Sequence, residues 1–275
     1  MIKYPIYTDD FMYDEMKIYE IPKFLYHYTS LDTLKLILKN RTIRFNRLDR
    51  VNDPNEARTL NLPNSNTAVF VSSWSDEEEE SLKMWEMYGD NLKGVRLKFP
   101  TNMFYGRNDP IVFEKGGCHV RYGRKIKIDR QDLTYPMETS LIIGPNKVCY
   151  TEEIDKLVSQ AIYNSEEYSV ASLYDLGQFK TLEWSYENEW RYKIVAFFNE
   201  FSLPNDKFTK DIFDLNKFPI IQEYIDVDLD STIMNEIEIT FGLEVTNDEI
   251  NIFKNFLKTN NIACSLKNST VETYV

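Results

Sequence analysis

The segment YENEWR, residues 186–191, opens a run, 186–198, that is rich in aromatic and β-branched residues. This composition predicts one long strand, around which the rest of the fold is arranged. Because side chains alternate across a strand, one face is expected to carry Tyr186, Asn188, Trp190, Tyr192 and Ile194. The other face is expected to carry Glu187, Glu189 and Arg191, spaced roughly 7 Å apart.

The charged face of this strand has two readings. In the first, Glu187, Glu189 and Arg191 lie on a solvated face of a half-covered sheet, because charged side chains are costly to bury. In the second, they form the floor of a cleft in which one carboxylate is the catalytic group and its neighbour shifts its pKa. The sequence leaves both readings open.

The composition is that of a folded globular protein. The chain has 275 residues, of which 43% are hydrophobic and 14% aromatic, enough for a large core in one domain or two. The net charge of −12 argues against non-specific binding to nucleic acid or to anionic membranes. No run reaches the roughly 18 apolar residues of a membrane span, and residues 1–14 lack the apolar core of a signal peptide.

Cysteine and histidine usage predicts a cytoplasmic protein without a metal site. Three widely spaced cysteines, Cys118, Cys149 and Cys264, fit a reducing compartment. With only His27 and His119 and no C-x-x-C motif, a zinc site is not expected. The adjacent pair Cys118 and His119 is a weak signal for a nucleophile or a ligand.

The N-terminal half reads as alternating strands and helices. We expect a strand over 24–29, a helix over 31–40 capped by Ser30, and a strand over 41–47. A strand over 69–74 follows, and then a helix capped by Ser75 that carries Leu82, Trp85 and Tyr88 on one stripe and stops at Gly89. Another strand is expected over 94–99.

The C-terminal half is less regular at first. Residues 118–122 are a candidate strand, 151–164 and 166–182 read as helices, and 203–218 is a polar connection. Strands are expected over 224–230 and 236–241, then a helix that a Thr246 capping box opens and that runs to Leu257. The tail, 263–275, is a candidate last strand.

These elements predict a single α+β domain over 1–275. Its central mixed or antiparallel sheets form a cleft, with helices at the periphery. Residues 1–22 are expected to form an N-terminal arm, and residues 100–180 a variable, helical insertion. No dinucleotide-binding glycine motif, P-loop, H-E-x-x-H or G-x-S-x-G is present, which leaves carboxylate-centred chemistry if the protein is an enzyme.

Several short motifs together resemble the bacterial domain-of-unknown-function family 2971. They are LYHYTS (25–30), NDPNE (52–56), MWEMYG (84–89), Lys180 with WSYENEWR (184–191), and ITFG (239–242). Many members have an aromatic residue after the proline of the second motif, where this chain has Asn55. The family is named for its lack of an established reaction.

The order of these motifs also has a distant resemblance to ADP-ribosyltransferases. That resemblance implies that His27, with Tyr28 and Thr29 beside it, contacts a ribose, and that Tyr88 or Trp85 stacks on nicotinamide. It also implies that Glu189 is the catalytic carboxylate, with Glu187 two residues before it as in the Glu-x-Glu members. NAD would then be the substrate, and arginines would pair with its pyrophosphate, the candidates being Arg44, Arg47, Arg50 and Arg191.

Each of these residues also has a structural reading. His27 can be a hydrogen-bonded structural histidine, Trp85 and Tyr88 can be core residues, and the arginines can balance an acidic surface. The Asn52-Asp53-Pro54 segment reads as a turn, with Glu56 as a candidate cleft acid.

Three functional hypotheses follow. The first is an NAD-dependent ADP-ribosyltransferase or NAD glycohydrolase in phage defence or a toxin system. The second is a metal-dependent phosphodiesterase or nuclease built from Asp53, Glu56, Glu187 and Glu189. The third is a non-catalytic module that binds a nucleotide or a macromolecular partner. The first requires His27, Tyr88 and Glu189 to line one pocket.

Overall fold

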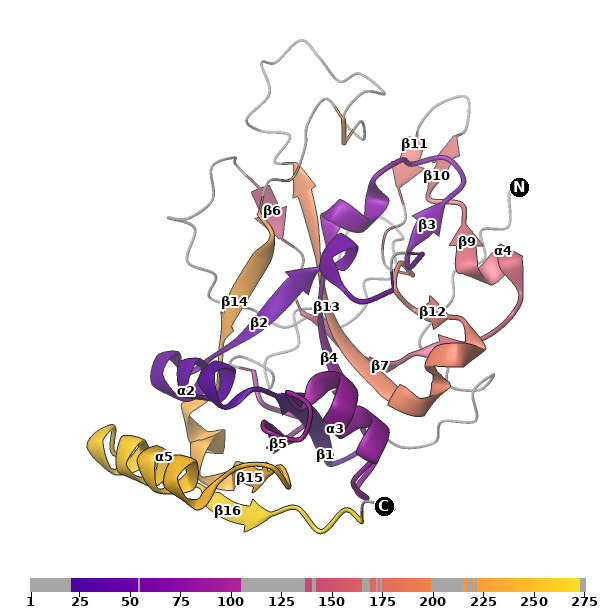
Figure 1. The fold of residues 1–275 in the computed structure, drawn as a ribbon. Helices are drawn as coiled ribbons and strands as arrows, with labels where there is room; N and C mark the ends of the chain where they lie inside the picture. The colour runs from indigo at the N-terminus through magenta and orange to yellow at the C-terminus, as the bar shows by residue number, and fades with distance from the viewer. Residues whose placement is uncertain are drawn as a thin grey trace.

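The computed structural model describes residues 21–53, 55–104, 137–139, 142–164, 169–171, 173, 175–198, 215–216, 220 and 222–272. The candidate strand 118–122, the Cys118 and His119 pair, and most of the arm 1–22 and of the connection 203–218 lie outside these residues. The described part is α+β, as expected, with strands in one large mixed sheet and a few helices (Figure 1).

One large sheet organises the described residues. Its main path runs β14-β2-β4-β1-β5-β15-β16, and β13 joins it by pairing with β4, β6 and β7. All of its pairings are antiparallel except that of β15 with β16. Its strands are β1 (Phe24–Thr29), β2 (Thr42–Arg47), β4 (Val69–Ser75), β5 (Val95–Pro100), β6 (Met137–Thr139), β7 (Ile143–Lys147), β13 (Glu189–Phe198), β14 (Tyr224–Asp228), β15 (Glu238–Phe241) and β16 (Ser265–Asn268).

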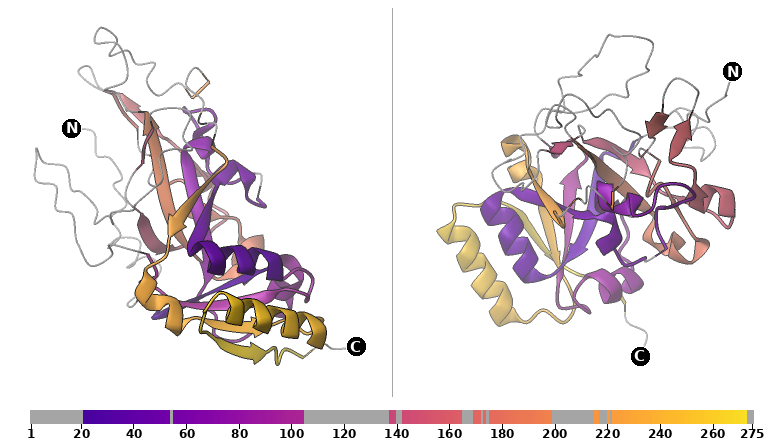
Figure 2. Two further views of the ribbon diagram at one scale, coloured as in Figure 1. Left: turned by 90° about the vertical axis from the view of Figure 1, so that its left-hand side faces the viewer. Right: turned by 90° about the horizontal axis from the view of Figure 1, so that it is seen from above.

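The remaining elements of the described residues are short strands, four α-helices and the 3₁₀ helices Leu48–Arg50, Ser65–Ala68, Leu182–Glu187 and Ser231–Glu236. Three two-stranded pairs stand apart from the large sheet and join β3 (Arg58–Thr59) with β9 (Val158–Ser159), β8 (Cys149–Tyr150) with β12 (Phe179–Lys180), and β10 (Ile162–Asn164) with β11 (Ser169–Ala171). The helices are α2 (Leu31–Asn40), α3 (Leu82–Tyr88), α4 (Ile154–Leu157) and α5 (Asn247–Thr259). Helices α2 and α5 lie side by side in all three ribbon views (Figures 1 and 2).

Strand β4 is the junction of the sheet. Near its start it pairs with β2, through Phe70 and Val71, and at its end it pairs with β1, at Ser75. Strand β13 follows β4 from Val69 to Ser75. Between these two contacts, at residues 72–74, β4 pairs with neither β2 nor β1, so the two strands diverge from each other along this edge of β4. We call this divergence the fork of the sheet.

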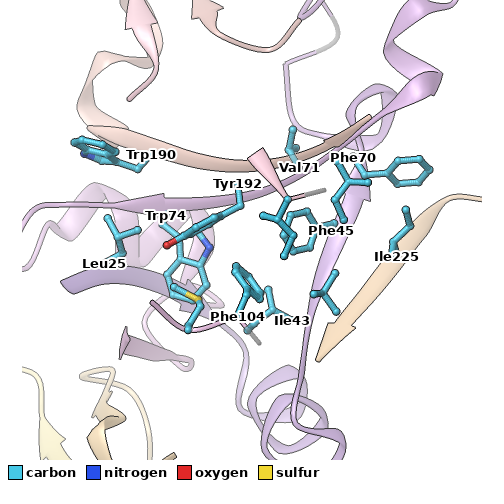
Figure 3. Packing of buried hydrophobic residues seen from close by; sticks show 14 of the residues in the cluster. Leu25, Ile43, Phe45, Phe70, Val71, Trp74, Phe104, Trp190, Tyr192 and Ile225 are labelled. Carbon is cyan, nitrogen blue, oxygen red and sulfur yellow. The ribbon is translucent and has the colours of Figure 1, made fainter. Parts of the chain in front are cut away.

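The core lies between β13, β4 and the strands of the fork (Figure 3). Tyr192 packs edge-on against Phe104, with ring centroids 4.9 Å apart, and Phe104 packs against Phe45 at 5.4 Å. The Tyr192 hydroxyl donates a hydrogen bond of 2.6 Å to the Thr101 carbonyl, so the buried phenol is satisfied. Trp190, Tyr192 and Ile194 are all buried, as expected for the aromatic face of the central strand.

The central strand begins three residues later than predicted. Residues Leu182–Glu187 form a 3₁₀ helix, and Asn188 has a left-handed backbone with φ 43°. Asparagine tolerates this conformation better than most residues, so it can end the 3₁₀ helix and turn the chain into β13. Glu187 therefore does not share a strand face with Glu189, and the prediction that strand alternation aligns them is wrong.

Other boundaries also differ from the prediction. The helix start at Ser75 is wrong, because residues 76–80 are not helical and Ser81 caps α3 instead. The predicted helices over 151–164 and 166–182 are wrong in the described residues, which contain the one-turn α4, short strands and the 3₁₀ helix. By contrast, the α2 helix and its Ser30 cap, the strands β1 and β2, and the α5 capping box are confirmed.

We expect Thr246→Ala to lower the free energy of unfolding by about 1 kcal/mol, because Thr246 Oγ1 accepts a hydrogen bond from the Glu249 amide at the start of α5. Urea denaturation measures the loss. Lys254→Ala, at an exposed position of the same helix, should change the free energy by less than about 0.5 kcal/mol. Equal effects of the two substitutions would contradict the capping role.

Candidate functional site

A pocket of about 250 Å³ lies at the fork of the sheet. Strands β1, β2, β4, β12 and β13, helix α3 and the segment 50–52 all contribute to its wall. The lining residues are Tyr26, His27, Tyr28, Asn46, Arg50, Val51, Asn52, Ser73, Trp74, Ser75, Met84, Tyr88, Lys180, Glu187, Glu189 and Arg191. Elements far apart in the sequence therefore meet here because β1 and β2 part from β4.

The pocket brings together seven of the eleven residues that the resemblance to ADP-ribosyltransferases singles out, and Arg47 is among those left out. The seven are His27, Tyr28, Arg50, Tyr88, Glu187, Glu189 and Arg191. The shared pocket of imidazole, phenol and carboxylate that the NAD hypothesis requires is therefore present. The roles assigned to these residues stay predictions.

Thr29, Arg44 and Trp85 do not line the pocket. Trp85 is fully buried, packs edge-on against Tyr28 and donates to Glu80 Oε2 at 2.9 Å, so it belongs to the core. Arg44 lies on the exposed face of β2, where it binds Asp226 at 2.8 and 2.9 Å. Of the two proposed ring walls, only Tyr88 faces the pocket.

His27 spans the gap in the fork. Its Nδ1 lies 2.9 Å from the carbonyl oxygen of Ser73, where β1 no longer pairs with β4, and its ring lies 5.1 Å from that of Trp74. Burial lowers the pKa of His27, and the hydrogen bond to Ser73 only partly opposes this shift. The imidazole is therefore neutral at pH 7, with Nδ1 as donor to the carbonyl and Nε2 as an acceptor.

A buried pair of carboxylates forms the floor of the pocket. Lys180 Nζ donates to Glu187 Oε2 at 2.6 Å and to Glu189 Oε2 at 3.2 Å, so one ammonium bridges the two carboxyl groups. Glu187 is 5% exposed and Glu189 is 3% exposed, so the solvated-face reading is wrong. The 3₁₀ turn places Glu187 beside Glu189, although the two do not share a strand face.

The pKa of Glu189 is raised to about 7. Burial is the main cause, the Lys180 ammonium opposes it, and the nearby negative charge of Glu187 adds to it. For Lys180, burial alone would lower the pKa, but the two carboxylates outweigh burial and raise it. The ammonium therefore stays charged at pH 7.

Arg191 fixes the opposite side of Glu189. Its Nε and one Nη donate to Glu189 at 2.5 and 2.9 Å, and the guanidinium also forms a bidentate pair with Glu56 and donates to the Gly177 carbonyl at 2.8 Å. Glu56 is buried, as a cleft acid would be, but it does not line the pocket. Asp53 accepts from the Asn55 amide, as the turn reading predicts.

The Tyr88 hydroxyl connects helix α3 to the carboxylates. It donates a hydrogen bond to Glu187. Burial, together with the Glu187 carboxylate, raises the pKa of Tyr88, so the phenol stays protonated. Tyr88 therefore lines the pocket as a hydrogen-bond donor to the carboxylate pair.

Lys180 is the pocket residue that sequence reasoning left without a role. It stands in β12, and β12 pairs with β8 rather than with the large sheet. The sequence offers one signal, the position of Lys180 just before the central strand among the motifs of the family resemblance. Ser73 and Asn46 carry no signal, because each looks like an ordinary strand residue.

The charges of the site leave no vacant carboxylate cluster for a metal ion. Among the described residues, no group of three or more His, Cys, Asp or Glu side chains is arranged to hold a metal ion. The oxygens of Glu187, Glu189 and Glu56 already accept from Lys180 and Arg191.

Fold and site together define an α+β protein with a small, aromatic pocket over a buried acid–base cluster. The family described as "Protein of unknown function (DUF2971)" has a model that matches residues 84–192, which confirms the resemblance over that part. The match contains Tyr88, Lys180, Glu187, Glu189 and Arg191, but not His27. No curated protein and no solved structure matches the chain. In the described residues, no helix is both long and apolar enough to cross a membrane.

The raised pKa of Glu189 predicts how stability depends on pH. Because the folded pKa, about 7, lies above the ordinary value of 4.5, the folded protein binds this proton more tightly than the unfolded chain does. The stabilisation is complete below about pH 4.5 and is lost as the pH rises to about 7, a change of up to roughly 3 kcal/mol. Urea denaturation between pH 4.5 and 8 should show this loss in the wild type and not in Glu189→Gln; parallel profiles would contradict it.

Arg191→Met should lower the free energy of unfolding by about 3–5 kcal/mol, because it leaves Glu56 and Glu189 buried without a guanidinium. Arg44→Met is the matched control, since its partner Asp226 is solvated, and it should cost less than about 1 kcal/mol. Thermal and urea unfolding of both variants measure the difference. Similar losses in the two variants would mean that the buried ion pairs of Arg191 contribute no more to the free energy of unfolding than a solvated pair does.

Proposed function

We propose that the protein is an NAD-directed enzyme that breaks the bond between nicotinamide and ribose and passes the ADP-ribose to water or to an acceptor. One observation carries the proposal: a buried carboxyl pair, with the pKa of Glu189 near 7, at the floor of an aromatic pocket that also contains His27. Perturbed carboxyl groups in clefts are typical of catalytic sites. The distant resemblance to ADP-ribosyltransferases supplies the substrate.

The chemistry needs a fixed negative charge next to the ribose. As the bond from ribose C1′ to the nicotinamide nitrogen breaks, its electron pair leaves with nicotinamide and positive charge develops on C1′. Ionised Glu189, held rigidly by Lys180 and Arg191, would stabilise that charge without having to reorganise. Water or an acceptor hydroxyl then bonds to C1′ and gives its proton to the carboxyl pair.

The carboxyl pair can accept the proton that the acceptor loses. A general base works best with a pKa near the working pH, which describes Glu189. Glu187 shares the Lys180 ammonium with Glu189 and accepts from the Tyr88 hydroxyl, so the second carboxylate is held next to the first.

The remaining walls suit a nucleoside. Tyr26, Tyr28, Trp74 and Tyr88 offer aromatic surface for a flat ring. Neutral His27 presents its Nε2 as an acceptor for a ribose hydroxyl, since Nδ1 is engaged by the Ser73 carbonyl. The volume of about 250 Å³ is at the small end of ligand pockets, so it suits one half of a dinucleotide better than the whole.

A non-catalytic binding module is the second candidate, and one observation favours it. Glu189 is buried, and both of its oxygens accept from Arg191 or Lys180. In a binding module, this carboxylate would have the structural role of holding β12 and β13 together beneath the pocket. The metal-dependent nuclease hypothesis fits less well, because a cation would have to displace the ammonium and the guanidinium from the same oxygens.

The biological setting rests on resemblance alone. A role in phage defence or in a toxin system, and a cytoplasmic location, remain part of the proposal. Both would follow naturally for an enzyme that consumes or transfers part of NAD.

We expect Glu189→Gln to lower NAD turnover by at least about 100-fold, because the amide cannot stabilise positive charge at C1′. Release of nicotinamide, followed by chromatography, measures turnover, and calorimetry measures NAD binding, which should change only a few-fold. Circular dichroism checks that the fold is kept.

Glu183→Gln is the matched control. Glu183 lies in the same 3₁₀ helix as Glu187, but it is exposed and accepts from the Thr181 hydroxyl, so the substitution should leave turnover unchanged. Wild-type protein that fails to bind NAD overturns the proposal. Binding without turnover, equal in the wild type and Glu189→Gln, would establish the binding module instead.

A further inference from the structure

We propose that Arg50, with the amide side chains of Asn46 and Asn52, forms a phosphate-binding mouth on the pocket, and that Glu223 occupies the guanidinium until a phosphorylated ligand replaces it. The inference deepens the proposed function and rests on it. It names the ligand class of the pocket as a nucleoside carrying a phosphate on the side away from the base.

The structure separates Arg50 from the other candidate arginines. Arg44 does not line the pocket and is paired with Asp226, and Arg191 is buried with its donors used by Glu56, Glu189 and the Gly177 carbonyl. Arg47 is tied to Asp49 at 2.6 and 3.0 Å and to backbone carbonyls. Among these four arginines, Arg50 is therefore the only one that both lines the pocket and is held solely by an exposed partner.

The contact of Arg50 with Glu223 is readily exchanged. The side chains are 54% and 60% exposed, and solvated pairs of this kind contribute little stability. A phosphate offers the same guanidinium a doubly charged, bidentate acceptor. Replacing the carboxylate by a phosphate therefore costs little and gains a stronger contact.

The mouth and the floor have different chemistry. Asn46, Arg50 and Asn52 are all exposed and offer amide and guanidinium donors, whereas the carboxyl groups of Glu187 and Glu189 are buried. A ligand that satisfies both ends needs a neutral or cationic ring inside and an anionic group outside. A nucleoside phosphate has this polarity, and the pocket volume suits one ring with one sugar.

The backbone that carries Glu223 is fixed independently of its side chain. The Arg47 amide donates to the Glu223 carbonyl at 2.9 Å, and the Arg47 guanidinium donates to the Gln222 carbonyl at 3.1 Å. Removing the Glu223 carboxylate therefore frees Arg50 without releasing this segment from β2.

The test compares nicotinamide mononucleotide with nicotinamide riboside, which share ring and sugar and differ by the phosphate. By calorimetry, the mononucleotide should bind the wild type about 10- to 100-fold more tightly, and Arg50→Ala should remove this preference. Glu223→Gln should raise mononucleotide affinity up to about fivefold, because it weakens the competitor. Added salt should weaken mononucleotide binding more than riboside binding.

Arg44→Ala is the matched control, since Arg44 is also an exposed arginine paired with an acid of the neighbouring segment, and it should leave both affinities unchanged. Equal affinities for the two compounds, or a preference that survives Arg50→Ala, overturn the phosphate mouth while leaving the proposed function standing. If neither compound binds, the proposed function is decided by the binding of NAD itself, as above. Titration of inorganic pyrophosphate into the wild type and Arg50→Ala then tests the phosphate-binding mouth alone: binding that depends on Arg50 supports it, and its absence overturns it.

Discussion

The need to neutralise buried charge shapes this protein more than any other interaction. Arg191 is a buried residue of β13, and its charge is neutralised by two carboxylates. One belongs to Glu189 on the same strand and the other to Glu56 in a loop distant in sequence. An isolated buried ion would cost several kcal/mol, so these contacts hold Glu56 against the central strand. The same requirement brings Lys180 between Glu187 and Glu189. Charge compensation among these side chains therefore positions the residues that form the floor of the pocket.

The pocket exists because the sheet divides. Strands β1 and β2 pair with different ends of β4, and the residues between those contacts face open space instead of another strand. His27 satisfies one of the carbonyl groups there, and aromatic side chains from β1 and β4 form the walls. A continuous sheet would have closed this gap with backbone hydrogen bonds. Because β1 and β2 do not pair with this part of β4, a cavity remains next to the charge cluster. Arg50 lies at its polar opening.

Local sequence signals predicted the regular elements well and the irregular ones badly. The Ser30 cap, the alternation in 42–47 and the Thr246 capping box each depend on neighbours within four residues, and each is confirmed. The predicted central strand starts too early because YEN looks like strand sequence, whereas Asn188 adopts a left-handed conformation and residues 182–187 form a 3₁₀ helix. The helices predicted over 151–164 and 166–182 are wrong in the described residues, because tertiary contacts rather than periodicity decide short segments such as β9, β10, β11 and β12.

The sequence by itself determined the α+β class, the aromatic strand at the centre and the presence of Glu189 and Arg191 next to one another. Only the tertiary structure decided that these charges are buried and that Lys180 joins them. It also decided that Tyr88, and not Trp85, faces the pocket. The physical reason is the separation along the chain over which each interaction acts. Capping and alternation act between near neighbours in the chain, whereas burial and charge compensation depend on which distant segments meet, and that depends on how the strands are ordered in the sheet.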